Sequence, residues 1–338
     1  MTKNILVTGG AGYIGSHVCK ALSQDGFNPI AYDNLCTGNR EAVKWGALEV
    51  GDILDVDRLD NIIDQYNPVA IMHFAALIQV GESVSDPARY YYNNVYGSYC
   101  LLEQARKNGI KNMVFSSTAA VYGIPQSDMI TEEHPLAPIN PYGATKLAME
   151  NMIRDYSSAY GLNYAILRYF NAAGADPDGE LGTAYPKDTH IIPLLMQTAT
   201  GERPQIDIFG TDYNTPDGTA IRDYIHVTDL ARAHVLSLQH ILNGQGNLTL
   251  NLGTSSGFSV RHVLETARQV TTCSIPSDDK PRREGDPKIL VADANTAKIT
   301  LNWIPELSNL QDIIKTAWEW QNKKKLLGSK GAFHKLET

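Results

Sequence analysis

A glycine-rich turn near the amino terminus constrains the fold of this chain more than any other feature. The apolar run Ile5–Val7 stops at Gly9, and Gly12 and Gly15 follow at regular spacing, directly before a helix-compatible segment over 16–24. In such a strand–turn–helix unit, glycines let the chain turn tightly and let backbone approach a pyrophosphate, which the helix amino terminus attracts. The turn therefore predicts a dinucleotide site in a doubly wound parallel α/β (Rossmann) sheet.

An aspartate after the next strand indicates which dinucleotide is bound. The second strand is predicted over 28–32, and Asp33 follows Gly15 by 18 residues. A carboxylate at about this spacing accepts hydrogen bonds from a ribose hydroxyl and repels a 2′-phosphate. We therefore predict NAD as the cofactor.

Length and charge limit the classes to which this protein can belong. A chain of 338 residues fits one large domain or two modest ones, and 43% hydrophobic with 20% charged residues is typical of a globular protein. The net charge of −8 argues against a nucleic-acid partner, which needs a basic face. No apolar stretch reaches the length of a membrane span, so we predict no membrane partner and a cytoplasmic location.

The cysteines predict neither a metal site nor a disulfide framework. Cys19, Cys36, Cys100 and Cys273 are scattered, with no C-x-x-C pair and no spacing typical of metal ligands. We interpret them as reduced thiols that are buried or have no functional role.

Polar residues near the predicted strand ends allow alternative interpretations. Asp52 follows a strand over 48–50, so it can contact the adenine or cap a helix over 56–66. Asn93, on the helix that begins at Pro87, can cap that helix or touch the cofactor. His73 lies in a strand predicted over 69–76 and is interpreted as a packed, hydrogen-bonded residue.

A tyrosine and a lysine lie four residues apart on a helix predicted over 141–160. Tyr142 and Lys146 share one face of that helix and can point together into the ligand crevice. The pKa of a phenol must fall by about 3, or roughly 4 kcal/mol, before it acts as a base at neutral pH. An ammonium about 4 Å away, at an effective dielectric constant of about 20, stabilises the phenolate by about 4 kcal/mol. Lys146 is therefore predicted to hold Tyr142 as a phenolate.

Together with further motifs, these features resemble the extended short-chain dehydrogenase/reductase family and, within it, the enzymes that epimerise UDP-sugars at C4. The similarity extends over nearly the whole chain, up to about Gln321. The motifs that carry it are Thr8–Gly15, His73–Ala76, Val80–Ser83, Ser116–Thr118, Tyr142-x-x-x-Lys146, Leu167–Asn171, Arg222–Val227 and Pro281–Asp286.

The resemblance implies roles for individual residues. Thr118 and Tyr142 should bracket the 4-hydroxyl of the sugar. The residues expected to contact NAD are Tyr13, Ile14, Asp33, Asn34, Asp52, Ile53, Phe74, Asn93, Lys146 and Phe170. The residues expected to hold the UDP portion are Asn171, His190, Phe209, Arg222, Arg283 and Asp286. Leu290 stands at the position that gates the sugar pocket, and its intermediate size leaves acceptance of N-acetylated sugars open.

The two arginines also suit this role by their chemistry. Arg222 and Arg283 come from distant segments, and two guanidiniums brought together can bind a pyrophosphate. The alternative is ion pairing with neighbours such as Asp223 and Glu284.

The predicted organisation interleaves two domains. The Rossmann domain takes 1–171 and about 226–253, because a strand over 249–253 can return to the first sheet. The smaller mixed α/β substrate domain takes about 172–225 and 254–321, with 176–189 as a loop over the pocket. Residues 322–338 are predicted as a flexible tail, and the resemblance implies a homodimer through the helix around Tyr90–Asn94.

The implied activity is reversible epimerisation at C4 of a UDP-hexose, UDP-glucose or UDP-galactose, through a transient 4-keto sugar with tightly bound NAD. N-acetylhexosamine and uronic acid substrates stay open. A nucleotide-sugar dehydratase or decarboxylase is the second hypothesis, disfavoured because Ala119 and Ala120 follow Thr118 where related dehydratases carry Asp-Glu. A non-catalytic NAD-binding sensor is the third, and the intact Tyr142 and Lys146 argue against it.

Overall fold

Seven parallel strands form the main sheet of this protein in its computed structural model. The structure describes residues 2–183, 188–283 and 285–334, and residues 327–334 through their backbone alone. The strand order is β12-β7-β5-β4-β1-β2-β3. These strands are β1 (Asn4–Thr8), β2 (Asn28–Asp33), β3 (Ala47–Val50), β4 (Ala70–His73), β5 (Asn112–Thr118), β7 (Asn163–Tyr169) and β12 (Leu248–Leu252). The order reverses direction at β1, which places a topological switch point between β1 and β4.

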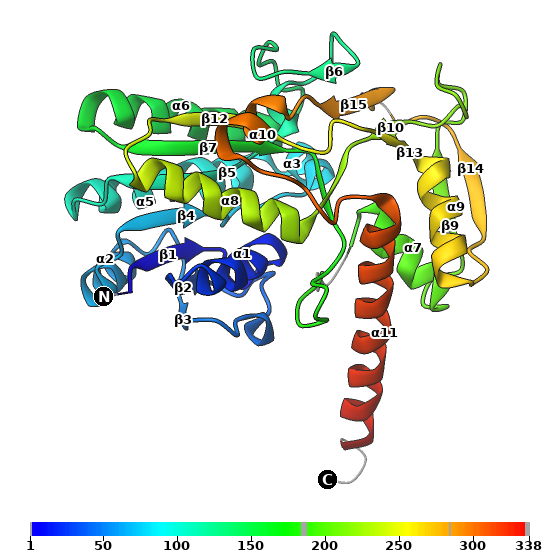
Figure 1. Ribbon diagram of the computed structural model, residues 1–338, viewed down its shortest axis with the longest axis horizontal. Coiled ribbons are helices and arrows are strands. Elements are labelled where there is room, and N and C mark those ends of the chain that lie inside the picture. Colours follow the sequence, from blue (N-terminus) through cyan, green and yellow to red (C-terminus); the bar gives the residue numbers. More distant parts are fainter. Residues whose placement is uncertain (1, 184–187, 284, 335–338) are drawn as a thin grey trace.

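Helices cover both faces of this sheet, as the doubly wound prediction requires (Figure 1). One face packs against α1 (Tyr13–Gln24), α8 (Val227–Leu242) and α10 (Asn295–Leu301). The other packs against α2 (Val56–Tyr66), α5 (Gly97–Lys107) and α6 (Pro141–Tyr160). The strands are almost continuously apolar because both of their faces are buried. The predicted fold class is therefore confirmed.

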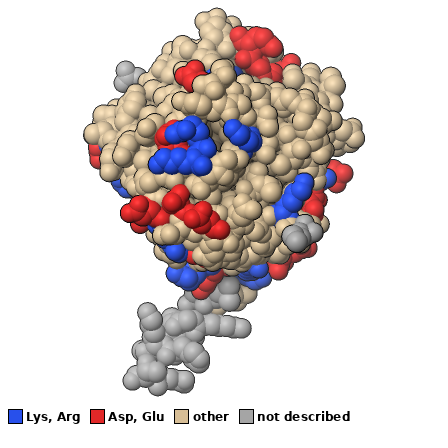
Figure 2. Space-filling model, turned by 90° about the vertical axis from the view of Figure 1, so that its left-hand side faces the viewer, with Lys and Arg blue, Asp and Glu red and all other residues tan. Residues whose placement is uncertain are grey.

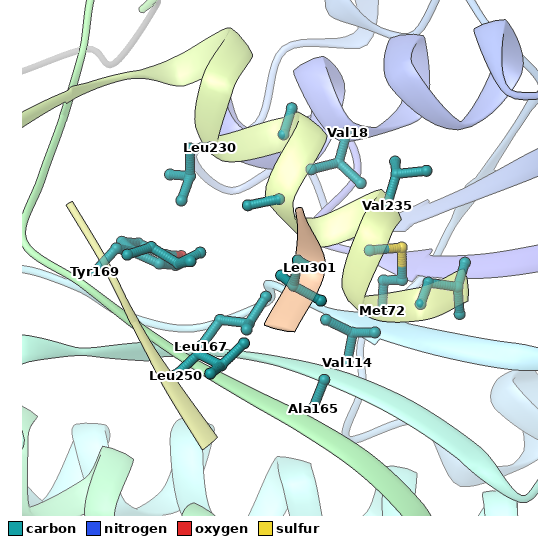
Figure 3. Packing of buried hydrophobic residues seen from close by; sticks show 14 of the residues in the cluster. Val18, Met72, Val114, Ala165, Leu167, Tyr169, Leu230, Val235, Leu250 and Leu301 are labelled. Atoms are coloured by element: carbon teal, nitrogen blue, oxygen red, sulfur yellow. The ribbon is translucent and has the colours of Figure 1, made fainter. Parts of the chain in front are cut away.

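The core on the α1/α8 side shows how these layers interlock. Val18 of α1 and Val235 of α8 lie over the strand residues Met72 and Val114, while Leu250 of β12 continues the same cluster (Figure 3). All five side chains are buried. The predicted return of the chain to the first sheet is thus observed, because β12 pairs with β7 in parallel register.

The second half of the chain adds small sheets and helices beside the carboxyl ends of the main strands (Figure 1). Its elements are β8 (Asn171–Ala173), α7 (Ile191–Ala199), β9 (Ile206–Phe209), β10 (Ile221–Arg222), β11 (Tyr224–His226), β13 (Phe258–Ser259), α9 (Val260–Thr271), β14 (Ser277–Lys280), β15 (Ile289–Ala292) and α11 (Leu310–His334). They are joined by β6 (Met129–Ile130) from the first half of the chain. The remaining short elements are η1 (Arg40–Ala42), α3 (Val80–Ser85), α4 (Pro87–Tyr90), the π-helix η2 (Tyr91–Tyr96) and η3 (Ala119–Val121). Strand β6 forms because pairing with β15 supplies its backbone partners.

One helix cap differs from the sequence-based interpretation. Asp55, not Asp52, caps α2, since its side chain accepts from the backbone N–H of Arg58. Helix α8 is capped by His226, whose ring accepts from the N–H of Thr228.

The carboxyl-terminal segment also differs from its prediction. Helix α11 continues to His334 and extends away from the main sheet, so the described part of the predicted tail is helical (Figure 1). Residues 335–338 lie outside the described residues.

Surface charge is dispersed on the face shown in Figure 2. Lysines and arginines form small groups beside acidic residues, with uncharged surface between them. This described face therefore offers no broad basic area for a nucleic acid. No described helix is both long and apolar enough to cross a bilayer.

Candidate active site

A large cavity opens at the carboxyl ends of the main strands, between them and the second half of the chain. Its volume is about 1140 Å³. Nearly all of the predicted site residues line it, and they come from segments far apart in the sequence. The predicted residues in its lining are Gly9, Gly12, Tyr13, Ile14, Gly15, Asp33, Asn34, Asp52, Ile53, Phe74, Asn93, Thr118, Tyr142, Lys146, Phe170, Asn171, His190, Arg283 and Leu290.

The glycine turn has no room for larger side chains. A Cβ at Gly15 would lie 2.2 Å from the carbonyl oxygen of Gly9, and one at Gly9, where φ is +73°, would lie 2.7 Å from the nitrogen of Ala75. Gly12 directly precedes α1, whose first-turn N–H groups therefore face the cavity. The turn is thus built for close approach of an anionic ligand to backbone.

Asp33 joins this turn to the end of β2. Its carboxylate accepts from the N–H of Ala11 (3.0 Å) and of Leu35 (2.8 Å). Burial raises the pKa of Asp33, and these two N–H groups lower it. The carboxylate is therefore fixed in the cavity wall, in the position expected for a ribose partner.

Asp52 lines the cavity beside Asn34. The Asn34 amide donates to one carboxylate oxygen of Asp52 (2.7 Å), and the N–H of Leu54 donates to the other (2.9 Å). Of the two interpretations from sequence, the structure removes the helix cap and leaves the ligand contact. Asn93 likewise lines the cavity and donates to Asn94, which in turn binds both backbone groups of Leu77.

Tyr142 and Thr118 meet in the cavity lining. Helix α6 begins at Pro141 after an Asn140 cap, and β5 ends at Thr118, so the two side chains converge from different elements. Burial raises the pKa of Tyr142 to about 12, and a hydrogen bond with Thr118 acts in the opposite direction. The protein groups by themselves do not bring this pKa down to neutral pH, because burial penalises the phenolate more than they favour it.

Lys146 is buried one turn further along α6. Its Nζ donates to the carbonyl oxygen of Ser116 (2.8 Å) and lies 4.9 Å from the centre of the Phe115 ring. Burial lowers the pKa of Lys146 to about 7, while the Glu150 carboxylate raises it. The ammonium is therefore close to its titration point at neutral pH.

Four of the six residues predicted to hold UDP form two pairs. Arg283 lines the cavity and stacks on the Phe209 ring at 3.9 Å. Arg222 pairs with Asp286 (2.5 Å). Phe209, Arg222 and Asp286 are not among the described residues of the cavity lining.

The acidic neighbours expected as ion-pair partners of the arginines do not pair with them among the described residues. Asp223 is occupied by the backbone N–H groups of Thr254 and Ala292, and Glu284 lies outside the described residues. The ion pairing that the sequence left open therefore does occur at Arg222, with Asp286 as the partner.

His73 is a packed residue, as its sequence context indicated. Its ring bonds Thr8 (2.6 Å) and Ser98 (2.8 Å), and burial lowers its pKa to about 3. It stays neutral and ties β4 to α5.

Part of the site escaped sequence reasoning. Helix α11 contributes Ala317, Trp320 and Gln321 to the cavity, and no local motif marks them. The Trp320 indole donates to the carbonyl of Thr183 (2.9 Å), at the end of the loop predicted over 176–189, whose residues 184–187 lie outside the described residues. Buried Glu150 and Arg168, below the cavity floor, were also not identified.

The fold and site define a dinucleotide-binding Rossmann protein with a tyrosine–lysine pair beside the cofactor position. The glycine cradle, the fixed Asp33 carboxylate and the size of the cavity fit NAD. Residues 5–253 match the model of the NAD dependent epimerase/dehydratase family. The chain belongs to that family and is an NAD-dependent enzyme.

Its relatives extend over almost the full length. The chain is 48% identical to a UDP-glucose 4-epimerase of Rhizobium leguminosarum bv. trifolii, over 95% of this chain and 98% of the relative. It is 49% identical to one from Rhizobium meliloti (strain 1021), with the same coverage. The crystal structure of UDP-glucose 4-epimerase from Brucella ovis in complex with NAD superposes with a TM-score of 0.92 at 50% identity, covering 94% of this chain and 98% of that one.

Proposed function

We propose that this protein reversibly epimerises a UDP-hexose at C4, interconverting UDP-glucose and UDP-galactose with tightly bound NAD. The observation that carries this proposal is the convergence of Thr118 and Tyr142 in the cavity that the glycine turn lines. Ala119 and Ala120 complete this part of the lining and have no group that transfers protons. A dehydratase needs a further acid/base pair there, so epimerisation is favoured.

The chemistry divides between the cofactor and the protein. Bound NAD would supply the hydride acceptor for C4 of the sugar and, once reduced, the hydride donor for the opposite face. The Oη of Tyr142 takes the proton of the 4-hydroxyl, and Thr118 hydrogen-bonds the same oxygen. The oxygen then becomes the carbonyl of a 4-keto sugar, and the proton on Tyr142 goes back to it when the hydrogen returns.

Electrostatics decide when Tyr142 can act as the base. The protein groups leave its pKa at about 12. A cation close to the phenol stabilises the phenolate, and both Lys146 and a positively charged nicotinamide would supply such charge. We therefore expect the base to form in the complex with oxidised cofactor.

Inversion at C4 requires firm binding of UDP and weak binding of the sugar. We assign the diphosphate and uridine to Arg283, Phe209, His190 and Asn171, with Arg222 and Asp286 as a supporting pair. A sugar that pivots on this anchor can present either face to the cofactor.

The test is conversion of UDP-galactose to UDP-glucose by the purified protein without added NAD. No conversion by folded protein that contains NAD would refute the proposal, and release of a 4-keto-6-deoxy sugar would show a dehydratase. The same assay with the N-acetylhexosamine and uronic acid pairs determines the substrate. A Leu290→Tyr variant that loses only the N-acetylated substrates would assign Leu290 to the sugar pocket.

We also propose a homodimer in the cytoplasm. Tyr90 is buried, but Tyr91, Tyr92, Tyr96 and Tyr99 are each more than two-fifths exposed on η2 and α5. Exposed aromatic rings on neighbouring turns favour association with a second apolar surface. Light scattering of the purified chain tests the dimer, and a Tyr92→Glu/Tyr96→Glu variant should be monomeric.

A further inference from the structure

We propose that Glu150 is a positioning residue for this reaction, which fixes the end of β5 against α6 and keeps the ammonium of Lys146 charged. The inference rests on the proposed function, because it concerns the residues assigned to proton transfer. Glu150 does not line the described cavity, so it acts through Lys146 and Thr118 and not on the substrate.

Glu150 is fully buried on α6, one helical turn after Lys146. Ser117 donates to its Oε1 (2.6 Å), and Arg168 of β7 donates to both carboxylate oxygens (2.9 and 2.6 Å). Arg154 donates to Oε2 (2.8 Å). A buried carboxylate with this many donors is held in one orientation and in its charged form.

These bonds clamp the strand that carries Thr118. The carbonyl of Ser116 accepts from Lys146, and the hydroxyl of the next residue, Ser117, donates to Glu150. Two consecutive residues of β5 are therefore tied to α6, just before Thr118. The separation between Thr118 and Tyr142 depends on this double attachment.

The charge of Glu150 acts on the same lysine. The groups recorded against Lys146 are Glu150 on α6, His73 on β4, and Phe115 and Ser116 on β5. The titratable Tyr142 lies one turn before Lys146 on α6, and the hydroxyl of Tyr169 on β7 bonds the Ser116 hydroxyl. His73 is neutral because burial lowers its pKa to about 3. Glu150 is thus the anion in this described set, and its carboxylate opposes the effect of burial on Lys146.

A pH dependence follows from competition for one proton. As the pH rises, either Tyr142 or Lys146 can lose its proton, and only loss from Tyr142 gives the phenolate beside an ammonium. Activity should therefore rise with pH until Lys146 begins to titrate and then level off. Without the Glu150 charge, Lys146 loses its proton at lower pH. The activity plateau then begins at lower pH, and its rate is smaller.

The experiment compares the pH profile of kcat for UDP-galactose in the NAD-containing wild type and in Glu150→Gln. We expect the plateau of the variant to begin about one pH unit lower and to be about tenfold lower, with the two profiles converging below the wild-type inflection. Glu103→Gln is the matched control, since Glu103 is a helix carboxylate bonded to Arg106 outside the described cavity lining. Its profile should coincide with that of the wild type.

Glu150→Gln leaves the buried Arg168 guanidinium without its anion and can fail to fold. The paired variant Glu150→Gln/Arg168→Met removes both charges, and loss of the arginine partly offsets loss of the carboxylate. Its plateau should therefore be displaced in the same direction but by less. Ser117→Ala removes one bond of the clamp but no charge, so its rate should fall without a displaced inflection. A uniform loss of rate at all pH values in both Glu150 variants would overturn the inference, whereas an inactive wild type would instead refute the proposed function.

Discussion

The hydroxyl of Tyr13 donates a hydrogen bond to the main-chain carbonyl of Gly174 over 2.7 Å. Tyr13 is the first residue of α1, directly after the glycine turn, and Gly174 follows β8 in the second half of the chain. Both residues line the cavity. The bond therefore closes the cavity on the cofactor side, and the segment after Gly174 is held over α1.

Lys20 strengthens the same closure. Its Nζ bonds Asp176 (2.8 Å), Asp178 (2.6 Å) and Glu180 (3.0 Å). Lys20→Met should lower the free energy of unfolding by about 2 kcal/mol, because it leaves buried Asp176 without its cation, and should speed NAD release. Urea unfolding and the rate of cofactor loss on dilution measure the two effects.

Lys44→Met is the control for this prediction. Lys44 reaches the carbonyl of Glu180 from an exposed position (2.9 Å), so its loss should cost less than about 0.5 kcal/mol. Equal effects of the two variants would contradict a specific role for Lys20.

Tyr142→Phe should reduce epimerisation about 1000-fold, because it removes the group assigned to proton transfer. NAD content and the unfolding midpoint should stay close to those of the wild type, since the ring still fills its buried site. Turnover of UDP-galactose, followed as UDP-glucose formed, gives the answer. Undiminished turnover would remove Tyr142 from the mechanism.

Thr118 offers a comparison of a hydroxyl with a methyl group. Thr118→Ser retains the hydroxyl and should keep its rate within about threefold, whereas Thr118→Val should lose about 100-fold through the missing hydrogen bond. The ratio of kcat values for the two variants is the measurement. If serine and valine were equally slow, packing of the residue would matter more than its hydroxyl.

Gly15→Ala should disrupt the cofactor cradle. The new Cβ would lie 2.2 Å from the Gly9 carbonyl oxygen, so the turn must shift. We expect a loss of about 2 kcal/mol in stability and a purified protein with much less NAD. Gly81→Ala, where no atom lies within 4 Å of the added carbon, is the stability control and should not lower the unfolding midpoint.

Buried histidines should make stability depend on pH. Burial lowers the pKa of His73 to about 3 and those of His17, His226 and His234 to about 4. The unfolded chain binds protons at these residues below its ordinary pKa of 6.5, while the folded chain does not. Stability is therefore complete above pH 6.5 and falls toward pH 4, by up to about 1.4 kcal/mol per pH unit for each histidine.

Urea midpoints between pH 7.5 and 4.5 test this slope. His234→Leu should make the slope of stability against pH shallower by the contribution of one histidine. The His234 ring packs against Phe74 and Tyr169 and has no ionic partner among the described groups. If the slope were the same in this variant as in the wild type, groups other than His234 would cause the loss of stability toward low pH.

Local patterns predicted much of the fold and the cofactor site. The helix predicted over 141–160 has those bounds in the structure, and β1 and β2 lie within a residue or two of their predicted positions. These elements are marked by apolar runs, glycines and a proline at a helix start, which act over a few residues. The strand predicted over 69–76 is shorter, because pairing ends at His73 and the small residues beyond it border the cavity.

The sequence by itself determined the Rossmann architecture, the NAD turn with Asp33 and the shared helix face of Tyr142 and Lys146, because each depends on neighbours in the chain. Only the tertiary structure decided that Asp52 faces the cavity, that Arg222 pairs with Asp286 and that Glu150 supports Lys146. It also decided the charge state of the site, since burial of Tyr142 and Lys146 shifts both pKa values against ionisation. Burial and contacts between distant segments arise only when the layers pack, so no local pattern could specify them.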